Sequence, residues 1–300
     1  MRTLQITEDT LIDFLILRLR IYYELIKFRL SALVTFSAVF GFILGDSGVV
    51  FSWGKFFALM LGGFLISGAS GAANEIWERD YDKLMKRTQN RPLPLNQISL
   101  KEAYWFTSAI AILGISILWI FTNPLTTLLG ILSMILYVFV YTPLKRVGPI
   151  AVFVGAIPGA MPPLLGWTAA TGAISHEALI IFGIQFIWQF PHFWAIAWVS
   201  DEDYKKAGFK LLPSGGKKDL NTAIQIMIYT LFLLPLGLLP TYFGLTGLNS
   251  GIVATVCGVL FLAQTFSLMK DFSRKSALKI MFGSFLYLPI VQIAYLLDKV

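Results

Sequence analysis

The chain has 300 residues, of which 56% are hydrophobic and only 14% are charged, and its formal net charge is +7. Soluble domains are closer to half apolar and a quarter charged, so this composition argues against a water-soluble enzyme. The single cysteine, Cys257, excludes an internal disulfide and a zinc site built from several cysteines.

Residues 1–26 precede the long apolar runs of the chain. The acidic residues Glu8, Asp9 and Asp13 argue against a transit peptide, and no apolar core ending in a small-residue cleavage site marks a signal peptide. Apolar and charged residues are mixed between positions 11 and 24, which predicts a helix lying on the cytoplasmic surface of a membrane.

The positions of the charged residues predict nine membrane-spanning helices, each needing about 20 apolar residues. The uncharged runs 103–144 and 220–269 are twice that length and contain turn residues midway, Asn123-Pro124 and Asn249-Ser250-Gly251, so each predicts a helical hairpin. The uncharged run 30–45 is short for a span, so Lys27 and Arg29 are expected to reach back to the lipid headgroups. The remaining runs predict one span each: 30–45, 56–74, 147–176, 178–200 and 280–297.

An odd number of spans places the two ends of the chain on opposite sides of the membrane. Of the 24 lysines and arginines, 22 fall on the side of the N-terminus, and only Lys55 and Lys299 fall on the other. Positive residues stay cytoplasmic in short loops, so we expect a cytoplasmic N-terminus and a C-terminus outside. Topology therefore explains the basic charge without nucleic acid, and residues 27–300 are expected to form one nine-helix unit.

Acidic residues gather after the second and the sixth span, at Glu75, Glu78, Asp80 and Asp82 and at Asp201, Glu202 and Asp203. Because Asn74, Glu78 and Asp82 are four residues apart, their side chains share one helical face as a ladder of oxygen ligands. Mg²⁺ is typically held by one or two carboxylates together with substrate phosphates, so the ladder predicts a site for a lipid diphosphate. The alternative is a solvated helix end with ion pairs such as Glu75 with Arg79.

Other polar residues near the predicted inner face allow two interpretations each. Lys145 and Arg146 end the fourth span, where a cation pair serves equally well as a phosphate ligand or as a marker of topology. His192 lies among aromatic residues of the sixth span, where a hydrogen-bonded packing role is favoured over metal ligation.

Six segments together resemble the UbiA-type intramembrane prenyltransferases, and within them the branch that farnesylates haem. The most specific is N-E-I-W-E-R-D-Y-D-K-L-M-K-R-T-Q-N-R-P-L-P at 74–94. The others are Y-T-P-L-K-R at 141–146, G-A-I-P-G-A-M-P-P-L-L-G-W at 155–167, W-Q-F-P-H-F-W at 188–194, D-Y-K-K-A-G-F-K-L-L-P at 203–213 and Y-L-P at 287–289.

The resemblance implies a bundle of nine helices around a central cavity that opens toward the bilayer, with Mg²⁺ and diphosphate at its cytoplasmic mouth. It assigns catalysis and metal binding to Asn74, Glu78, Asp82 and Asp203, and haem binding to His192. It assigns diphosphate binding to Arg87, Arg91, Lys145, Arg146 and Tyr204. The wider family has Asp-x-x-x-Asp in the second acidic segment, but here Lys205 stands four residues after Asp201, which weakens the second metal contact.

The activity implied by the resemblance is transfer of a farnesyl group from farnesyl diphosphate to the vinyl group of haem b, giving haem O, in a bacterial inner membrane. A haem A synthase or a terminal oxidase would then receive the product. One alternative is prenylation of an aromatic acceptor such as a hydroxybenzoate. Another is a multi-span transporter, although transporters usually place ionisable residues near the midplane rather than at one rim.

Overall fold

The computed structural model describes residues 8–300, so the first seven positions of the predicted surface segment lie outside the described residues. Within this range the chain is helical, and the only β-bridge is an isolated one between Thr246 and Lys299. The helices are α1 (Glu8–Leu25), α2 (Phe28–Gly45), α3 (Trp53–Asp82), α4 (Leu100–Phe121), α5 (Pro124–Ile135), the π-helix η1 (Leu136–Tyr141), α6 (Thr142–Leu144), α7 (Ile150–Thr171), α8 (His176–Val199), α9 (Asp201–Lys206), α10 (Leu220–Tyr242), α11 (Leu248–Asp271) and α12 (Arg274–Leu297).

Nine helical stretches between residues 8 and 300 are long and apolar enough to cross a membrane, which confirms the predicted number of spans. α5, η1 and α6 together form one of them. Several spans begin where a polar side chain accepts a hydrogen bond from a free backbone N–H of the first turn, as expected for N-caps. These caps are Ser99, Asn123, Ser175, Asp219 and Ser273.

One predicted turn is displaced. Asn249, Ser250 and Gly251 lie inside α11, and the chain turns before them, between α10 and α11. Asp298, near the C-terminus, supplies the cap of α11, because its Oδ2 accepts a hydrogen bond from the Ser250 N–H at 2.7 Å. The capping carboxylate lies 48 residues away in the sequence, so no local signal marks the start of α11. The prediction from the turn residues alone therefore placed this start too late.

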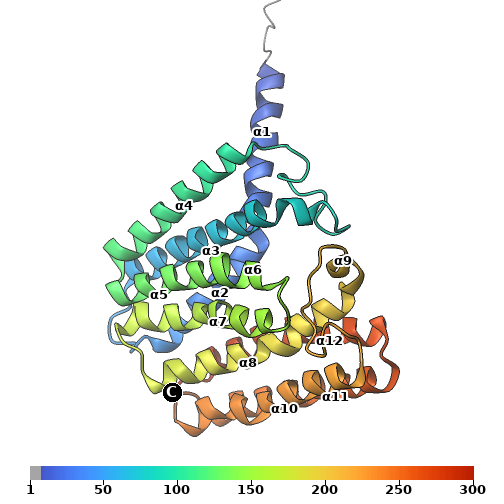
Figure 1. Cartoon of the computed structure of the whole chain (residues 1–300). Coiled ribbons are helices and arrows are strands. Elements are labelled where there is room, and N and C mark those ends of the chain that lie inside the picture. Colours follow the sequence, from blue (N-terminus) through green and yellow to red (C-terminus); the bar gives the residue numbers. More distant parts are fainter. Residues whose placement is uncertain (1–7) are drawn as a thin grey trace, which may run out of the picture.

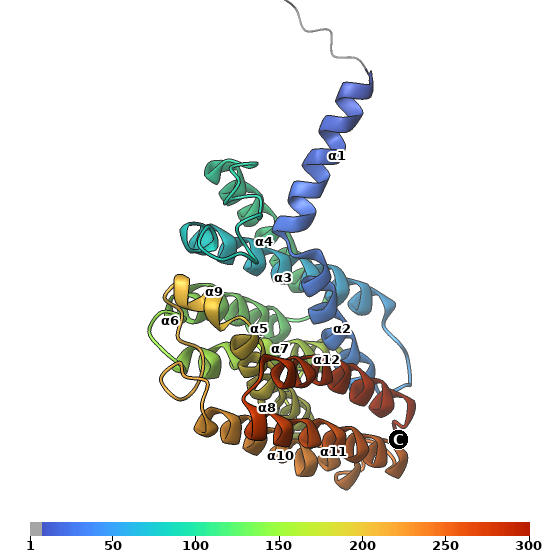
Figure 2. The ribbon, with the colours of Figure 1, turned by 90° about the vertical axis from the view of Figure 1, so that its right-hand side faces the viewer.

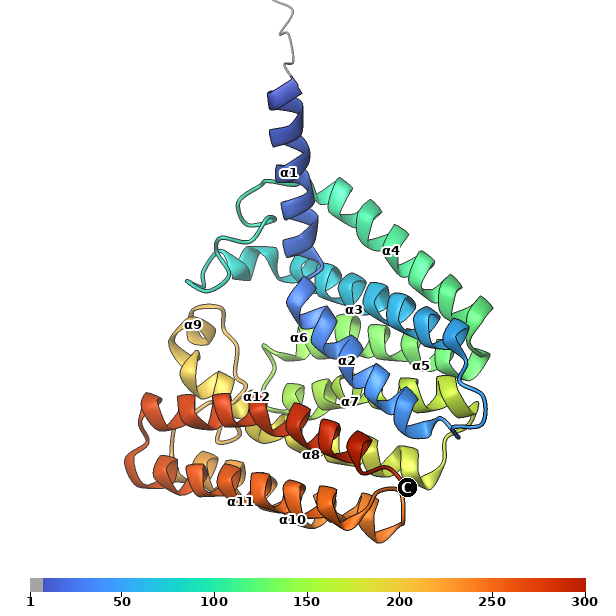
Figure 3. The ribbon, with the colours of Figure 1, turned by 180° about the vertical axis from the view of Figure 1, so that it is seen from behind.

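α7 is the most buried of the nine spans and packs against α2, α5 and α8. Figure 3 shows α2 running obliquely between α3 and α12, which closes the wall around the centre of the bundle. A Cβ atom at Gly41 would lie 1.9 Å from the Pro163 carbonyl oxygen, and one at Gly166 would lie 1.8 Å from that of Ala38. α2 and α7 therefore approach so closely that only glycine fits at these two positions.

The two acidic segments lie at the same end of the bundle, as Figures 1 and 2 show for α9 and for the chain that follows α3. The C-terminus lies at the opposite end, where the Lys299 ammonium donates to the backbone carbonyls of Ile43 and Asp46. α1 extends away from the bundle (Figure 2), with Phe14 and Leu19 among its exposed apolar side chains. Its placement on a membrane surface and the cytoplasmic position of the N-terminus stay predictions.

Candidate active site at one end of a central cavity

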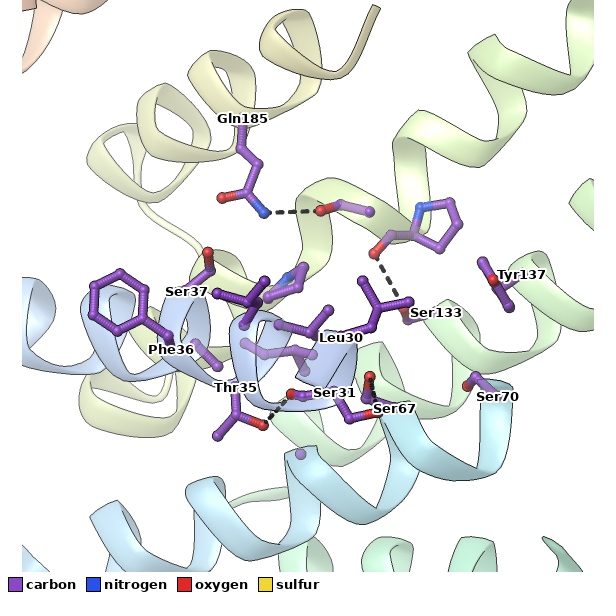
Figure 4. A pocket seen from close by; sticks show the side chains of 18 of the residues that line it. Leu30, Ser31, Thr35, Phe36, Ser37, Ser67, Ser70, Ser133, Tyr137 and Gln185 are labelled. Atoms are coloured by element: carbon purple, nitrogen blue, oxygen red, sulfur yellow. Dashed lines mark hydrogen bonds between the residues drawn. The ribbon is translucent and has the colours of Figure 1, made fainter. Parts of the chain in front are cut away.

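The helices enclose a cavity of about 380 Å³ whose lining is mostly apolar. α2, α3, α7, α8 and α12 contribute most of its wall, together with η1. Hydroxyl groups interrupt the apolar wall on α2 and α3, where the Ser67 hydroxyl donates to Ser31 at 3.3 Å (Figure 4). The cavity reaches Lys27 at the end of the bundle that carries both acidic segments.

The predicted ladder exists and is buried. Asn74, Glu78 and Asp82 lie on the last turns of α3 and expose 2%, 4% and 0% of their surface. Each of the three contacts one cation from another part of the chain. Lys27 Nζ donates to Asn74 Oδ1 at 2.8 Å, Lys145 Nζ lies 2.8 Å from Glu78 Oε1, and Arg91 NH1 lies 2.8 Å from Asp82 Oδ2.

Burial and neighbouring charges together determine the pKa of each of these cations. Burial, and after it the nearby Arg91 guanidinium, lowers the pKa of Lys27 to about 7. Burial also works against the charged form of Lys145, but the Glu78 carboxylate keeps the pKa of that ammonium above its ordinary value. The opposite charges of Asp82 and Glu75 likewise outweigh burial and raise the pKa of Arg91. This end of the cavity thus concentrates positive charge against an acidic wall.

Glu75 is a fourth buried side chain at the ladder. Its carboxylate Oε1 lies 3.4 Å from the Arg91 Nε atom, so the pairing with Arg79 considered from the sequence is wrong. Arg79 instead contacts Asp80, at 3.5 Å. Residues four apart share a helical face, but the buried Glu75 carboxylate pairs with Arg91, which the chain after α3 brings to it.

A π-helix positions the first residue of the ladder. The Asn74 amide donates to the Thr142 hydroxyl at 3.2 Å, and that hydroxyl donates to the Tyr137 carbonyl at 2.9 Å. η1 ends just before Pro143, which has no N–H to continue a regular helical ladder. Such widened turns are frequent at functional sites, and this one brings Thr142 and Lys145 to the ladder on α3.

The second acidic segment is joined to the chain that follows the first. The Asp203 carboxylate accepts hydrogen bonds from the backbone N–H groups of Lys86 and Arg87, both at 3.3 Å. The Arg87 guanidinium lies over the Tyr204 ring, 5.6 Å from its centre, and donates to the Tyr204 hydroxyl at 3.3 Å. Asp203, Arg87 and Tyr204 therefore form one contact network at the end of the bundle.

The predicted basic pair splits between two environments. Lys145 points inward, toward Glu78 and over the ring of Tyr141, at 4.8 Å from the ring centre. Arg146 is exposed, and its guanidinium donates to the Tyr81 hydroxyl at 2.7 Å. Consecutive residues of a helical turn point about 100° apart, so Lys145 reaches the buried ladder while Arg146 lies on the surface.

His192 lies on the cavity wall at some depth from the ladder. Its ring stacks on Trp188 with 4.4 Å between the ring centres, and its Nδ1 atom lies 2.8 Å from the Ser284 hydroxyl oxygen. The hydrogen bond agrees with the packing interpretation of this residue. Because its ring also lines the cavity, the imidazole is within reach of a molecule bound there.

The site oxygens fit a hard divalent cation. Oε2 of Glu75 and Oδ1 of Asp82 are buried without a hydrogen-bond partner among residues 8–300. Oxygen donors of this kind are those that Mg²⁺ prefers. In the described chain no three His, Cys, Asp or Glu side chains converge on one point, and Lys145 and Arg91 pair with Glu78 and Asp82 of the ladder. Asn74, Glu78, Asp82 and Asp203 stay predicted metal ligands.

Known proteins resemble this chain in both sequence and structure. The model of the UbiA prenyltransferase family matches residues 34–288. The chain belongs to the UbiA prenyltransferase family. A relative from Cytophaga hutchinsonii, named protoheme IX farnesyltransferase, is 51% identical over 279 residues, which are 93% of this chain and 97% of the relative.

Solved structures share the UbiA fold at low sequence identity. The one described as digeranylgeranylglyceryl phosphate synthase in membranes has a TM-score of 0.78 and 20% identity, and the match covers 93% of this chain and 98% of that one. A UbiA homologue from Archaeoglobus fulgidus, bound to GPP and Mg²⁺, has a TM-score of 0.63 and 19% identity, over 92% of this chain and 99% of that one. These matches confirm the predicted nine-helix fold.

Sequence reasoning missed the contacts of two residues of this UbiA site. Lys27 was expected to reach the lipid headgroups, but the structure turns it inward onto Asn74. The chain bends sharply there, because Lys27 itself adopts a left-handed conformation with φ of 49° between α1 and α2. From the sequence, Glu75 belongs to the first acidic group, and only the alternative interpretation as a solvated helix end gives it a partner, Arg79. Its position next to Asn74 was the only signal in the sequence that Glu75 lies at the site. Its contact with Arg91 depends on the fold of the chain after α3 and could not be predicted from helix periodicity.

Proposed function

We propose that this protein transfers a farnesyl group from farnesyl diphosphate to a vinyl group of haem b, giving haem O and diphosphate. The observation that carries the proposal is a row of three cations, Lys27, Arg91 and Lys145, on an acidic ladder beside a largely apolar cavity. Lys27 lines this cavity directly, and Lys145 lies over the ring of Tyr141, which also lines it. A prenyl diphosphate matches this arrangement, because the cations suit its anionic diphosphate and the apolar cavity suits its hydrocarbon tail. The name of the Cytophaga hutchinsonii relative supports farnesyl as the tail and protohaem as the acceptor.

Mg²⁺ is the proposed cofactor, held by Asn74, Glu78 and Asp82 with Asp203 as a further ligand from the second acidic segment. When bound, it would neutralise charge on the diphosphate as a Lewis acid. The unpartnered oxygen of Asp82 and the oxygen-only donor set support this assignment. The Mg²⁺ in the Archaeoglobus fulgidus homologue supports it independently.

The chain's own cations stabilise the departing diphosphate. When the bond between the farnesyl C1 atom and its oxygen breaks, the electron pair leaves with the diphosphate. Lys145 and Arg91 pair with the ladder at Glu78 and Asp82, where this charge is proposed to develop, and Arg87, Arg146 and Tyr204 are proposed to contact the outer phosphate. Cations fixed in advance in a water-poor site are effective because they need little reorganisation during the reaction.

The allylic cation left in the cavity is captured by the acceptor. The terminal vinyl carbon of haem b forms the new bond to farnesyl C1, which leaves a positive charge on the inner vinyl carbon. A water molecule then adds to that carbon and releases a proton, so the product carries a hydroxyethylfarnesyl group. His192 and Trp188 line the wall on which the haem is proposed to lie.

The protein is a multi-pass membrane protein, and we propose the bacterial inner membrane as its location. Haem b, farnesyl diphosphate and the bilayer are then its immediate partners. A haem A synthase or a terminal oxidase is the proposed consumer of the product. A transporter is less well supported, because the buried charges of the site gather at one end of the cavity and not at its middle.

The test supplies the purified full-length protein with haem b, farnesyl diphosphate and Mg²⁺ and analyses the pigments by mass spectrometry. The expected result is a product heavier than haem b by one farnesyl group and one hydroxyl group. Unchanged haem b together with prenylation of added hydroxybenzoate would replace the haem acceptor by an aromatic one. If no diphosphate is released and no acceptor is prenylated, the prenyltransferase assignment is rejected.

A further inference from the structure

Three polar side chains form a hydrogen-bonded cluster deep in the bundle. Ser37 of α2, Gln185 of α8 and Gln292 of α12 expose only 5%, 4% and 3% of their surface. The Gln292 amide donates to Gln185 Oε1 at 3.1 Å and to the Ser37 hydroxyl at 3.3 Å. Gln185 in turn donates to the Gly159 carbonyl of α7 at 2.8 Å. The cluster therefore links four helices at one level.

The cluster separates two hollows of unequal size. Gln185, Leu288 and Gln292 line both the central cavity and a second void of about 10 Å³. The far side of the second void consists of Phe40, Ile181, Ile184, Val291 and Tyr295. Figure 4 shows the Ser37 and Gln185 side chains pointing toward one another in the wall of the larger cavity. These side chains thus form a partition across what would otherwise be a deeper apolar cavity.

The partition stands at a definite depth below the diphosphate site. Lys27, at the mouth, immediately precedes Phe28, the first residue of α2. Ser37 lies nine residues after Phe28, which corresponds to ~13 Å along a helix axis. This distance is close to the extended length of three isoprene units. A fourth unit would have to extend beyond this level, where the cluster closes the cavity on the side of α8 and α12.

We propose that Ser37, Gln185 and Gln292 form the floor of the prenyl pocket and limit the prenyl donor to farnesyl length. The inference rests on the proposed function, because it places the diphosphate at the ladder and the tail along the cavity. Passage of a longer tail would break the amide hydrogen bonds and leave buried polar groups unpaired beside hydrocarbon, which costs free energy. A hydrogen-bonded floor therefore resists penetration better than flexible aliphatic side chains would.

A purely structural role makes a different prediction. Side-chain hydrogen bonds between membrane helices contribute modestly to stability. If the cluster served only to hold α2, α8 and α12 together, removing Gln292 would lower thermal stability and leave the chain-length preference unchanged. The two roles are separable by measuring preference and stability on the same variants.

The experiment compares the full-length protein with two variants at the floor. Gln292→Ala removes a side chain and lengthens the cavity, and Ser37→Leu adds a larger side chain and shortens it. Gln264→Ala is the matched control, because Gln264 lies against Gly283 and lines neither hollow. Protein in lipid nanodiscs with Mg²⁺ is given pairs of non-cleavable thiodiphosphate analogues carrying geranyl, farnesyl or geranylgeranyl tails. Relative affinities are measured by competition, and thermal stability is recorded in parallel.

The expected result is that Gln292→Ala raises the affinity for the geranylgeranyl analogue relative to the farnesyl one by ~10-fold or more. Ser37→Leu should shift the preference from farnesyl toward geranyl, and Gln264→Ala should leave both ratios at the wild-type values. Unchanged ratios in both floor variants, with the wild-type protein binding the analogues normally, would overturn the floor while leaving the proposed function intact. A wild-type protein that binds no analogue would overturn both.

Discussion

The ammonium of Lys145, just after α6, lies 2.8 Å from the Glu78 carboxylate of α3 and forms a buried ion pair between two spans at the cavity mouth. Both side chains are largely withdrawn from solvent, with 11% and 5% of their surface exposed. Removing one partner of such a pair leaves an uncompensated buried charge, which is strongly destabilising. The pair therefore influences both stability and the charge that meets the substrate.

We expect Lys145→Met and Glu78→Gln each to lower the melting temperature, in keeping with a loss of ~3 kcal/mol or more for a broken buried pair. The double variant should regain much of the lost stability, because no charge is left unpaired, but turnover should stay at least ~100-fold below wild type. Scanning fluorimetry and a turnover assay on all three variants provide the check. Recovery of turnover in the double variant would mean that the pair has only a structural role.

An exposed ion pair on the same helix serves as the reference for this cycle. Lys83 and Asp80 are 3.2 Å apart but expose 48% and 66% of their side chains. Pairs of this kind contribute ~1 kcal/mol at most. Lys83→Met should therefore leave both the melting temperature and turnover close to wild type.

The predicted metal ladder is tested at Asn74 and Asp82. Asn74→Ala and Asp82→Asn should abolish turnover while the protein still folds, because each change removes a proposed ligand and Arg91, the partner of Asp82, keeps its contact with Glu75. EDTA should stop the wild-type reaction, and added Mg²⁺ should restore it. Asp80→Asn is the control, since this acid lies on the exposed side of the same helix. Wild-type turnover in both ladder variants would remove the ladder from the mechanism.

The fold was largely predictable because lipid imposes a simple rule on the chain. Backbone groups in a membrane must pair within helices, so the lengths of the uncharged runs determine the number of spans. The ladder at Asn74, Glu78 and Asp82 was predictable for a related reason, since a spacing of four residues needs only a helix to bring side chains together. Both predictions depend on local periodicity alone.

The partners of the ladder depend instead on how distant helices pack. Lys27 precedes α2 and looks like a headgroup anchor until the bend before α2 directs it to Asn74. Arg91 meets Glu75 and Asp82 because the chain after α3 folds back along the end of the bundle. The displaced turn before α11 also depends on a distant contact, because the Asp298 carboxylate near the C-terminus accepts a hydrogen bond from the first turn of that helix. None of these contacts has a sequence spacing that would reveal it.

Asp203 should control the chain segment that carries Arg87. Its carboxylate accepts two backbone N–H groups, and hydrogen bonds to a charged group contribute about 1.5 to 3 kcal/mol each. We expect Asp203→Ala to expose residues 83–91 to trypsin and to raise the KM for farnesyl diphosphate by ~10-fold or more. Glu202→Gln, at an exposed neighbouring position, should change neither. Unaltered cleavage and KM in Asp203→Ala would show that the segment is held by other contacts.

His192 is predicted to bind the acceptor and not the prenyl donor, because it lies on the cavity wall and makes its hydrogen bond to Ser284 of α12. His192→Phe keeps a ring to stack on Trp188 but removes the polar nitrogens from the cavity. The KM for haem b should rise by ~10-fold, as expected for a lost hydrogen bond of about 1.5 kcal/mol, while binding of a farnesyl thiodiphosphate stays at the wild-type level. His176→Phe, at an exposed position, is the control. If donor binding weakens as much as haem binding in His192→Phe, the substitution has disturbed the whole cavity, and the haem-specific role is wrong.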